Sequence, residues 1–144
     1  MGRGYPRRAG CVEDSRSGRV NPPVQLDTSF LVRSCVPGSP ESSRMATWLE
    51  AGRPVAISAV AWAEFLCGPL SEADRSDAAQ LLGEPLPVAA RHGELAARLF
   101  NLTGRRRSSL SHCLIAAVAI DAKATLATAD SGLSRFAEAG LQLT

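Results

Sequence analysis

The chain has 144 residues, of which 45% are hydrophobic and 5% aromatic, and its formal net charge at pH 7 is +2. This length fits one ordinary domain, and this hydrophobic content excludes an intrinsically disordered chain. No apolar run approaches the roughly 20 residues of a membrane-spanning helix, so we expect a soluble, cytoplasmic protein.

The first 23 residues differ from the rest of the chain. They are rich in Gly, Arg, Ser and Pro and carry five arginines against two acids. We expect residues 1–23 to be a disordered or adventitious extension and residues 24–144 to form the domain. The domain then holds 11 basic and 12 acidic residues. Because it is nearly neutral, its overall charge gives no reason to expect nucleic-acid binding.

Strand and helix patterns alternate along the domain. Short apolar runs predict strands at residues 24–26, 54–58, 125–129 and 141–144, with a further extended piece at 85–88. Helices are predicted over residues 40–51, 59–67, 72–82, 90–104 and 111–122, and Ser39, Ser58 and Ser71 are expected to cap the first three. This alternation predicts a parallel sheet of about four or five strands between two layers of helices, an α/β/α architecture.

Three acids occupy informative places in this pattern. Asp27 and Asp130 follow predicted strands, and Glu64 lies in an otherwise apolar helix. Each has an ordinary structural interpretation, since Asp27 could cap a helix, Asp130 could be a turn residue and Glu64 could face solvent. Ligand sites in parallel sheets form at the carboxyl ends of the strands, and clustered carboxylates favour a bound cation. The three acids therefore indicate a possible Mg²⁺ or Mn²⁺ site.

Four stretches in order, "LDTSFLV", "ISAVAWAEFLCGP", "GRRRSSLSHCLIAAVAI" and "ATLATADSGLSRF", resemble the PIN-domain family and within it the VapC-type toxins. The resemblance runs from Val24 to the C-terminus. It implies a metal-dependent endoribonuclease of a type II toxin–antitoxin pair. The implied partners are an RNA of the tRNA or rRNA class, a cognate antitoxin and a second copy of the chain, with no membrane. The implied cofactor is Mg²⁺ or Mn²⁺.

Carried over by position, the resemblance assigns the metal ligands to Asp27, Glu64 and Asp130. It gives Thr28 and Thr128 supporting roles. The arginines before the last predicted helix could contact RNA phosphates or form a solvated loop; they are Arg105, Arg106 and Arg107.

His112 departs from the family pattern, because it stands where the resemblance implies a third acid. Three interpretations stay open. His112 could ligate the metal as a neutral imidazole, which the first turn of a helix favours. It could act as an acid, a base or a phosphate contact. Alternatively, loss of a carboxylate could attenuate catalysis and leave a protein that binds antitoxin or RNA without efficient cleavage.

Other classes of site fit the sequence less well. A phosphoacceptor domain requires an early acid pair and a late lysine, but the single lysine, Lys123, precedes its strand. A phosphatase with an aspartyl nucleophile requires Asp-x-Asp, whereas Asp27 is followed by Thr28 and Ser29. The four cysteines lack the close spacing of a zinc site, so we expect reduced thiols.

Overall fold

Short apolar segments from distant parts of the chain pair as one parallel sheet. The computed structural model describes residues 21–103 and 110–144. Its strands are β1 (Val24–Leu26), β2 (Val55–Ile57), β3 (Thr125–Ala127) and β4 (Gln142–Leu143). They are hydrogen-bonded in the order β2-β1-β3-β4, and every pairing is parallel. Most of the predicted extension and all three arginines at 105–107 lie outside the described residues.

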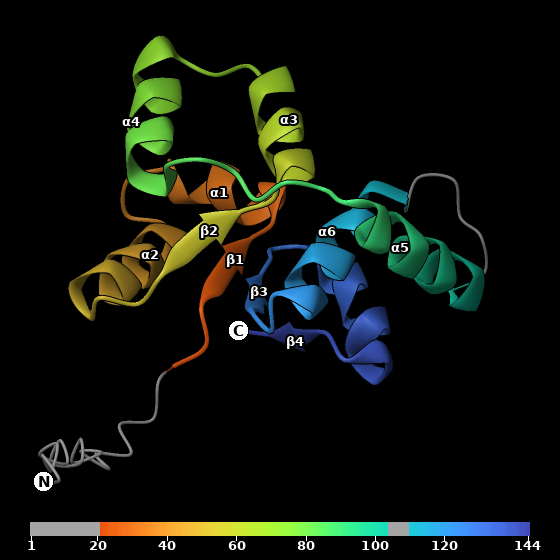
Figure 1. Ribbon diagram of the computed structural model, residues 1–144. Coiled ribbons are helices and arrows are strands. Elements are labelled where there is room, and N and C mark those ends of the chain that lie inside the picture. Colours follow the sequence, from red (N-terminus) through yellow and green to blue (C-terminus); the bar gives the residue numbers. More distant parts are fainter. Residues whose placement is uncertain (1–20, 104–109) are drawn as a thin grey trace, which may run out of the picture.

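Helices cover both faces of the sheet (Figure 1). The connection from β1 to β2 contains α1 (Thr28–Ser34) and α2 (Pro40–Glu50). The connection from β2 to β3 contains α3 (Ala59–Cys67), α4 (Glu72–Leu82), α5 (Ala90–Leu102) and α6 (Leu110–Asp121). Because β2 and β3 flank β1 on opposite sides, right-handed crossovers place α2 and α6 on opposite faces. The predicted three-layer α/β/α fold is therefore confirmed.

Three helices begin at the predicted serines. The Ser39, Ser58 and Ser71 hydroxyls accept hydrogen bonds from backbone N–H groups three residues later, at 3.0, 3.2 and 3.0 Å. These bonds satisfy N–H groups that have no partner within the helix. Ser58 directly follows the last residue of β2, so this cap sets where the chain leaves the sheet and α3 begins.

Two helical segments were not predicted. α1 follows Asp27 immediately, although its Phe30, Leu31 and Val32 form an apolar run that is also typical of a strand. The ring of Phe30 stacks on Trp48 of α2 at 5.3 Å, so tertiary packing favours the helix. The second segment, the 3₁₀-helix η2 (Ser131–Ala139), joins β3 to β4.

The core is built from small and aliphatic side chains. α6 is buried over most of its length, and its Ala116, Ala117 and Ala119 are fully buried. Within α5, Leu99 is buried, but Leu102 is 77% exposed although it shares the helical spacing. Cys35 and Cys67 are free thiols, in agreement with the prediction for these two. Over residues 21–103 and 110–144, no helix has both the length and the apolar character needed to span a membrane.

Arg53 organises the edge of the sheet where the strands begin. Its Nε donates to the Pro22 carbonyl at 2.8 Å, and its second guanidinium nitrogen donates to the Thr125 hydroxyl at 2.9 Å. The guanidinium also lies 5.8 Å from the ring centre of Trp48. This arginine therefore joins the chain before β1 to the start of β3.

Candidate active site

Asp27 lies directly after β1 and is almost completely buried, with 1% of its surface exposed. It occupies the N-cap position of α1, as the helix-cap interpretation expects, but its side chain makes no capping hydrogen bond. Its Oδ2 instead accepts hydrogen bonds from Ser29 at 2.8 Å and Thr128 at 2.7 Å. Because both hydroxyls donate to the same oxygen, Oδ1 is the atom that a cation could use.

Glu64 lies on α3 and faces α1. The Thr28 hydroxyl is 3.4 Å from its Oε2 and 3.3 Å from the carbonyl of Ala61. Within the described part of the chain, Oε1 of Glu64 is buried and has no hydrogen-bond partner. The solvent-facing interpretation of Glu64 is therefore wrong. A buried, unpartnered carboxylate oxygen fits the donor chemistry that Mg²⁺ or Mn²⁺ requires.

Asp130 follows β3 and begins η2. Its Oδ1 accepts a hydrogen bond from Gly132 N–H at 2.8 Å, so the expected turn role is present. A Cβ atom at Gly132 would come within 3.0 Å of that oxygen, which explains the glycine. The backbone N–H of Asp130 donates to Thr128 at 2.9 Å. Its Oδ2 points to His112, so one carboxylate oxygen shapes the loop and the other faces the site.

His112 is the third residue of α6 and is half-buried, with 27% of its side chain exposed. Its Nε2 lies 3.6 Å from Oδ2 of Asp130. This distance is too long for a hydrogen bond and permits an ion pair only if the imidazole is protonated. The structure thus places His112 beside an acid, as its position in the sequence predicts, without joining the two side chains firmly.

The predicted site residues are joined mainly through threonine hydroxyls. Thr128 connects Asp27 to the backbone of Asp130, which faces His112. Glu64 is joined to the same region through Thr28. In the residues that the structure describes, no group of three or more His, Cys, Asp or Glu side chains is close enough to hold a metal ion. The acids therefore lie at one edge of the sheet but do not form a closed cage.

Ser29 is the contributor that sequence reasoning missed. Its hydroxyl donates to Asp27 at 2.8 Å and accepts from the N–H of Ala129 at 3.1 Å. It also lies 3.3 Å from the Thr128 hydroxyl. Ser29 therefore ties the start of α1 to the loop after β3. The sequence feature that could have identified Ser29 is its position two residues after Asp27, the acid that follows β1.

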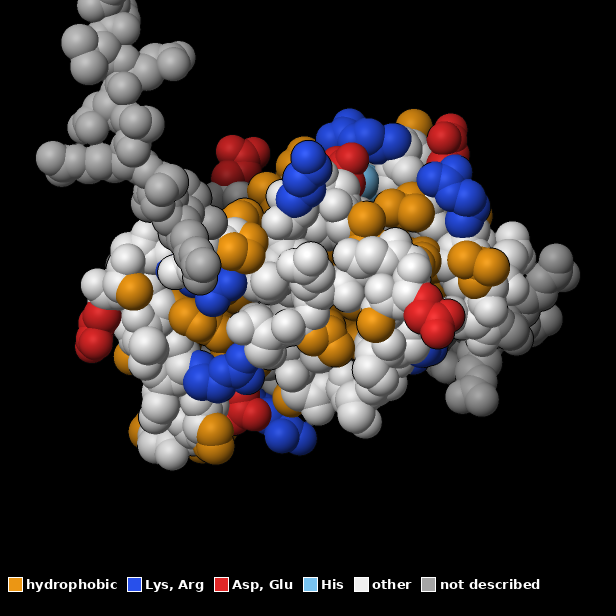
Figure 2. Space-filling view, turned by 90° about the horizontal axis from the view of Figure 1, so that it is seen from below, with side chains coloured by type: hydrophobic (Ala, Val, Ile, Leu, Met, Phe, Trp, Pro, Cys, Tyr) orange, Lys and Arg blue, Asp and Glu red, His pale blue; other side chains and the backbone are white. Residues whose placement is uncertain are grey.

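The surface around the fold has no broad charged field in the view of Figure 2, which looks from below relative to Figure 1. There, acidic and basic side chains of the described residues are interspersed with apolar ones. This distribution agrees with the nearly neutral composition of the domain. Any attraction for nucleic acid on this face would therefore be local rather than global.

Comparisons with known proteins agree with this architecture. Among solved structures, the fold is similar to VapBC2 from Rickettsia felis bound to a DNA fragment from their promoter, with 21% identity, a TM-score of 0.65 and coverage of 84% of this chain and 96% of that chain. The fold is also similar to FitAcB from Neisseria gonorrhoeae, with 22% identity, a TM-score of 0.61 and coverage of 84% of this chain and 96% of that chain. For VapC20 from Mycobacterium tuberculosis, a sarcin-ricin loop cleaving toxin, the identity is 21% and the TM-score is 0.59, with coverage of 84% of this chain and 98% of that chain.

The TM-scores show a shared fold, and at these low identities they show the fold alone. No curated protein matches the sequence. The family model described as PIN domain matches residues 24–139, which include β1, β2 and β3 together with Asp27, Glu64, His112 and Asp130. The chain therefore belongs to the PIN-domain family.

Proposed function

We propose that the protein is a metal-dependent endoribonuclease, the toxin of a toxin–antitoxin pair. One observation carries the proposal. At the carboxyl edge of the sheet, two hydroxyls donate to one oxygen of Asp27, and the Thr28 hydroxyl contacts one oxygen of Glu64. Within the described residues, the other oxygen of Glu64 is buried and has no hydrogen-bond partner. Membership of the PIN-domain family and the similarity of the fold to VapC toxins support it.

The carboxylates of Asp27, Glu64 and Asp130 would hold Mg²⁺ or Mn²⁺. Such an ion supplies charge stabilisation for phosphodiester hydrolysis. The residues around the acids set their orientation, because Thr28 holds Glu64 and Thr128 holds Asp27. Fixed carboxylates lose little rotational freedom when a ligand binds, which favours a preorganised site.

His112 bears on the choice of metal. It lies in the first turn of α6, beside Asp130. An imidazole nitrogen suits Mn²⁺ better than Mg²⁺, which prefers oxygen. We propose that His112 is the fourth contributor to the site and that Mn²⁺ supports activity at least as well as Mg²⁺.

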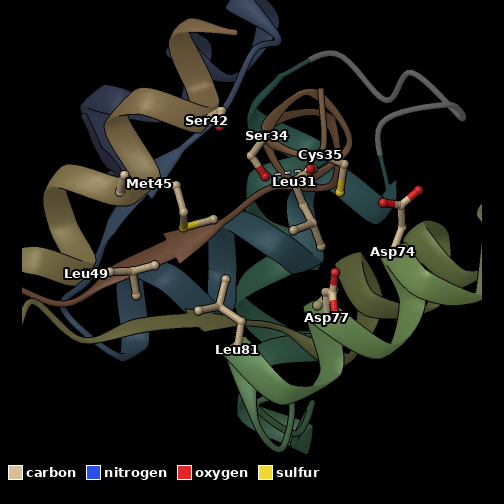
Figure 3. Close-up of a pocket in the computed structure, with 11 residues that line it drawn as sticks. Leu31, Ser34, Cys35, Ser42, Met45, Leu49, Asp74, Asp77 and Leu81 are labelled. Atoms are coloured by element: carbon tan, nitrogen blue, oxygen red, sulfur yellow. Dashed lines mark hydrogen bonds between the residues drawn. The ribbon is translucent and has the colours of Figure 1, made fainter. Parts of the chain in front are cut away.

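The proposed protein partners have candidate surfaces. A cavity of about 320 Å³ lies between α1, α2 and α4 (Figure 3). Leu31, Met45 and Leu81 contribute apolar surface, and Asp74 and Asp77 on α4 add negative charge. An antitoxin segment with apolar and basic side chains would complement this cavity. On α3, Trp62 and Leu66 are only partly buried, which supports the proposed homodimer.

The decisive experiment measures cleavage of tRNA and of a structured rRNA fragment by the full chain. We expect cleavage with Mg²⁺ or Mn²⁺ and none with EDTA. Asp27→Asn and Glu64→Gln should each reduce the rate by at least about 100-fold, because even residues that only support metal ligands commonly cost 10–100-fold. Glu50→Gln, which removes an exposed acid at the end of α2, is the matched control and should keep the activity.

Cleavage that persists in EDTA, or that survives Asp27→Asn, would exclude the proposed site. Thermal unfolding of each variant separates loss of the site from loss of the fold. The proposed RNA contact by Arg105, Arg106 and Arg107 can be tested in the same assay, where replacing all three with Ala should weaken RNA binding and its salt dependence.

A catalytically attenuated relative is the second candidate, and the geometry of His112 favours it. His112 replaces the expected carboxylate, and the described residues form no cluster of three potential ligands. If the wild-type chain does not cleave RNA with either metal but His112→Asp does, the attenuated candidate is correct. The native protein would then bind antitoxin or RNA without efficient cleavage.

A further inference from the structure

A fully buried amide lies beneath the candidate active site. Gln25 is the central residue of β1 and is 0% exposed. Its Nε2 donates to the backbone carbonyl of Ile115 in α6 at 3.1 Å. Within the described residues, its Oε1 is buried and has no hydrogen-bond partner. An amide with an unsatisfied oxygen costs stability in a core, so packing alone does not explain a glutamine at this position.

The hydrogen bond between Gln25 and Ile115 lies at a similar distance from Asp27 along β1 and from His112 along α6. The backbone of Asp27 is extended, so the side chains of Gln25 and Asp27 lie on the same face, about 6.6 Å apart along the strand. α6 precedes the parallel strand β3, so its first turn lies at the carboxyl edge of the sheet. His112 precedes Ile115 by three residues, about 4.5 Å along the same face of the helix.

The same bond closes a ring of contacts. From Asp27 the ring passes through the Thr128 hydroxyl to the backbone of Asp130, and then across 3.6 Å to His112. From His112 the ring continues along α6 to Ile115, whose carbonyl accepts the hydrogen bond from Gln25 in β1. Of the contacts in this ring, the Gln25 bond is the one that joins α6 directly to β1.

We propose that Gln25 is a positioning residue for His112, an inference that rests on the proposed metal site. Its hydrogen bond to Ile115 fixes the position of α6 along the direction of β1. This position determines the distance between His112 and the acids that follow the strands. The Ile115 carbonyl would still have the intrahelical N–H of Ala119 as a partner without Gln25, because α-helical bonds join residues four apart. Positioning is therefore separable from satisfying the helix.

The test compares Gln25→Met with the wild type in two measurements on the full chain. The Tm of Gln25→Met should be unchanged or higher, because the variant removes the unsatisfied oxygen and keeps the volume similar. The Kd for Mn²⁺, measured by isothermal titration calorimetry, should rise about tenfold, as for residues that orient metal ligands. In a His112→Ala background the same substitution should change the Kd less than about twofold.

Thr125→Val is the matched control. It removes a buried polar contact, that of Thr125 with Arg53, at the opposite edge of the sheet. It should leave the Kd for Mn²⁺ unchanged. An unchanged Kd in Gln25→Met, or an equal rise in both backgrounds, would overturn the positioning role. A lower Tm with an unchanged Kd would show that Gln25 is only structural.

A metal-free readout keeps this inference distinct from the proposed function. The chain has two histidines, so their ring signals in NMR spectra report on two places. Gln25→Met should shift the signals of His112 and leave those of His92 in place. Signals that stay fixed, or that shift equally, would overturn the inference. A wild type that binds no Mn²⁺ would exclude the metal site, whereas the His112 signals would still decide the role of Gln25.

Discussion

The two ends of α6 carry two histidine–aspartate contacts of different character. Near its C-terminal end, His92 is 4% exposed and its Nε2 lies 2.8 Å from Asp121. The other ring nitrogen of His92 accepts a hydrogen bond from the N–H of Ala89 at 2.9 Å. At the first turn of α6, His112 is more exposed and lies 3.6 Å from Asp130.

The difference separates a structural histidine from one available to a ligand. Because Nδ1 of His92 accepts a hydrogen bond from Ala89 N–H, its Nε2 carries the hydrogen and donates to Asp121, so both nitrogens are used. The result is a bridge between α5 and α6. The contact between His112 and Asp130 is too long for a hydrogen bond. Under the proposed function, Nε2 of His112 would contact a metal ion or a phosphate.

The largest expected effect comes from changing the looser contact. In His112→Asp we expect Mg²⁺ binding to strengthen about tenfold relative to Mn²⁺, since changes near a metal ligand commonly alter affinity by 10–100-fold. Calorimetric titration with each ion measures this ratio. Ala122→Asp adds the same charge at an exposed position directly after the end of α6 and should leave the ratio unchanged. An equal response of both variants would contradict the special position of His112.

Breaking the tighter contact should affect stability instead. His92→Ala removes two hydrogen bonds from a buried site and should lower the Tm by about 3–10 °C. Binding of Mn²⁺ should stay within about twofold of the wild type, because sites that share no partner behave independently. Arg98→Ala, at an exposed position of the same helix, is the control for loss of a side chain from α5. An unchanged Tm in His92→Ala would remove the distinction between the two histidines.

The smallest effect concerns the pH dependence of the tight contact. Hydrogen bonds from His92 and Arg91 hold the pKa of Asp121 below its ordinary value. A lowered pKa in the folded state contributes stability above the unfolded pKa of about 3.9, and this contribution is lost as the pH falls through the folded pKa. Between about pH 5 and pH 2, Asp121→Asn should therefore lose less Tm than the wild type. Glu50→Gln should retain the wild-type slope.

Local signals were sufficient for much of the fold. Ser39, Ser58 and Ser71 act on backbone groups three residues away, so their sequence context identifies them as caps. Asp27 and Asp130 were recognisable because each follows a strand, and parallel strands end at one edge. α1 was not among the predicted elements, because the packing of Phe30 against Trp48 of α2 stabilises a helix in an apolar run that is also typical of a strand.

The contacts that define the site are not local. Thr128 reaches Asp27 across 101 positions, Thr28 reaches Glu64 across 36, and Gln25 reaches Ile115 across 90. No short pattern determines which hydroxyl faces which carboxylate. The sequence therefore identified the acids, whereas only the structure shows which of their oxygens are already occupied.

Arg53 has a practical consequence for the experiments above. By binding the Pro22 carbonyl, it fixes the point where the chain enters β1 at the edge of the sheet away from Asp27 and Asp130. A purification tag or surface-immobilisation handle added before that point would be attached at the edge opposite the acids. A fusion joined directly before Pro22 is therefore the preferred format for RNA-binding measurements, whereas labels near η2 would lie beside the site.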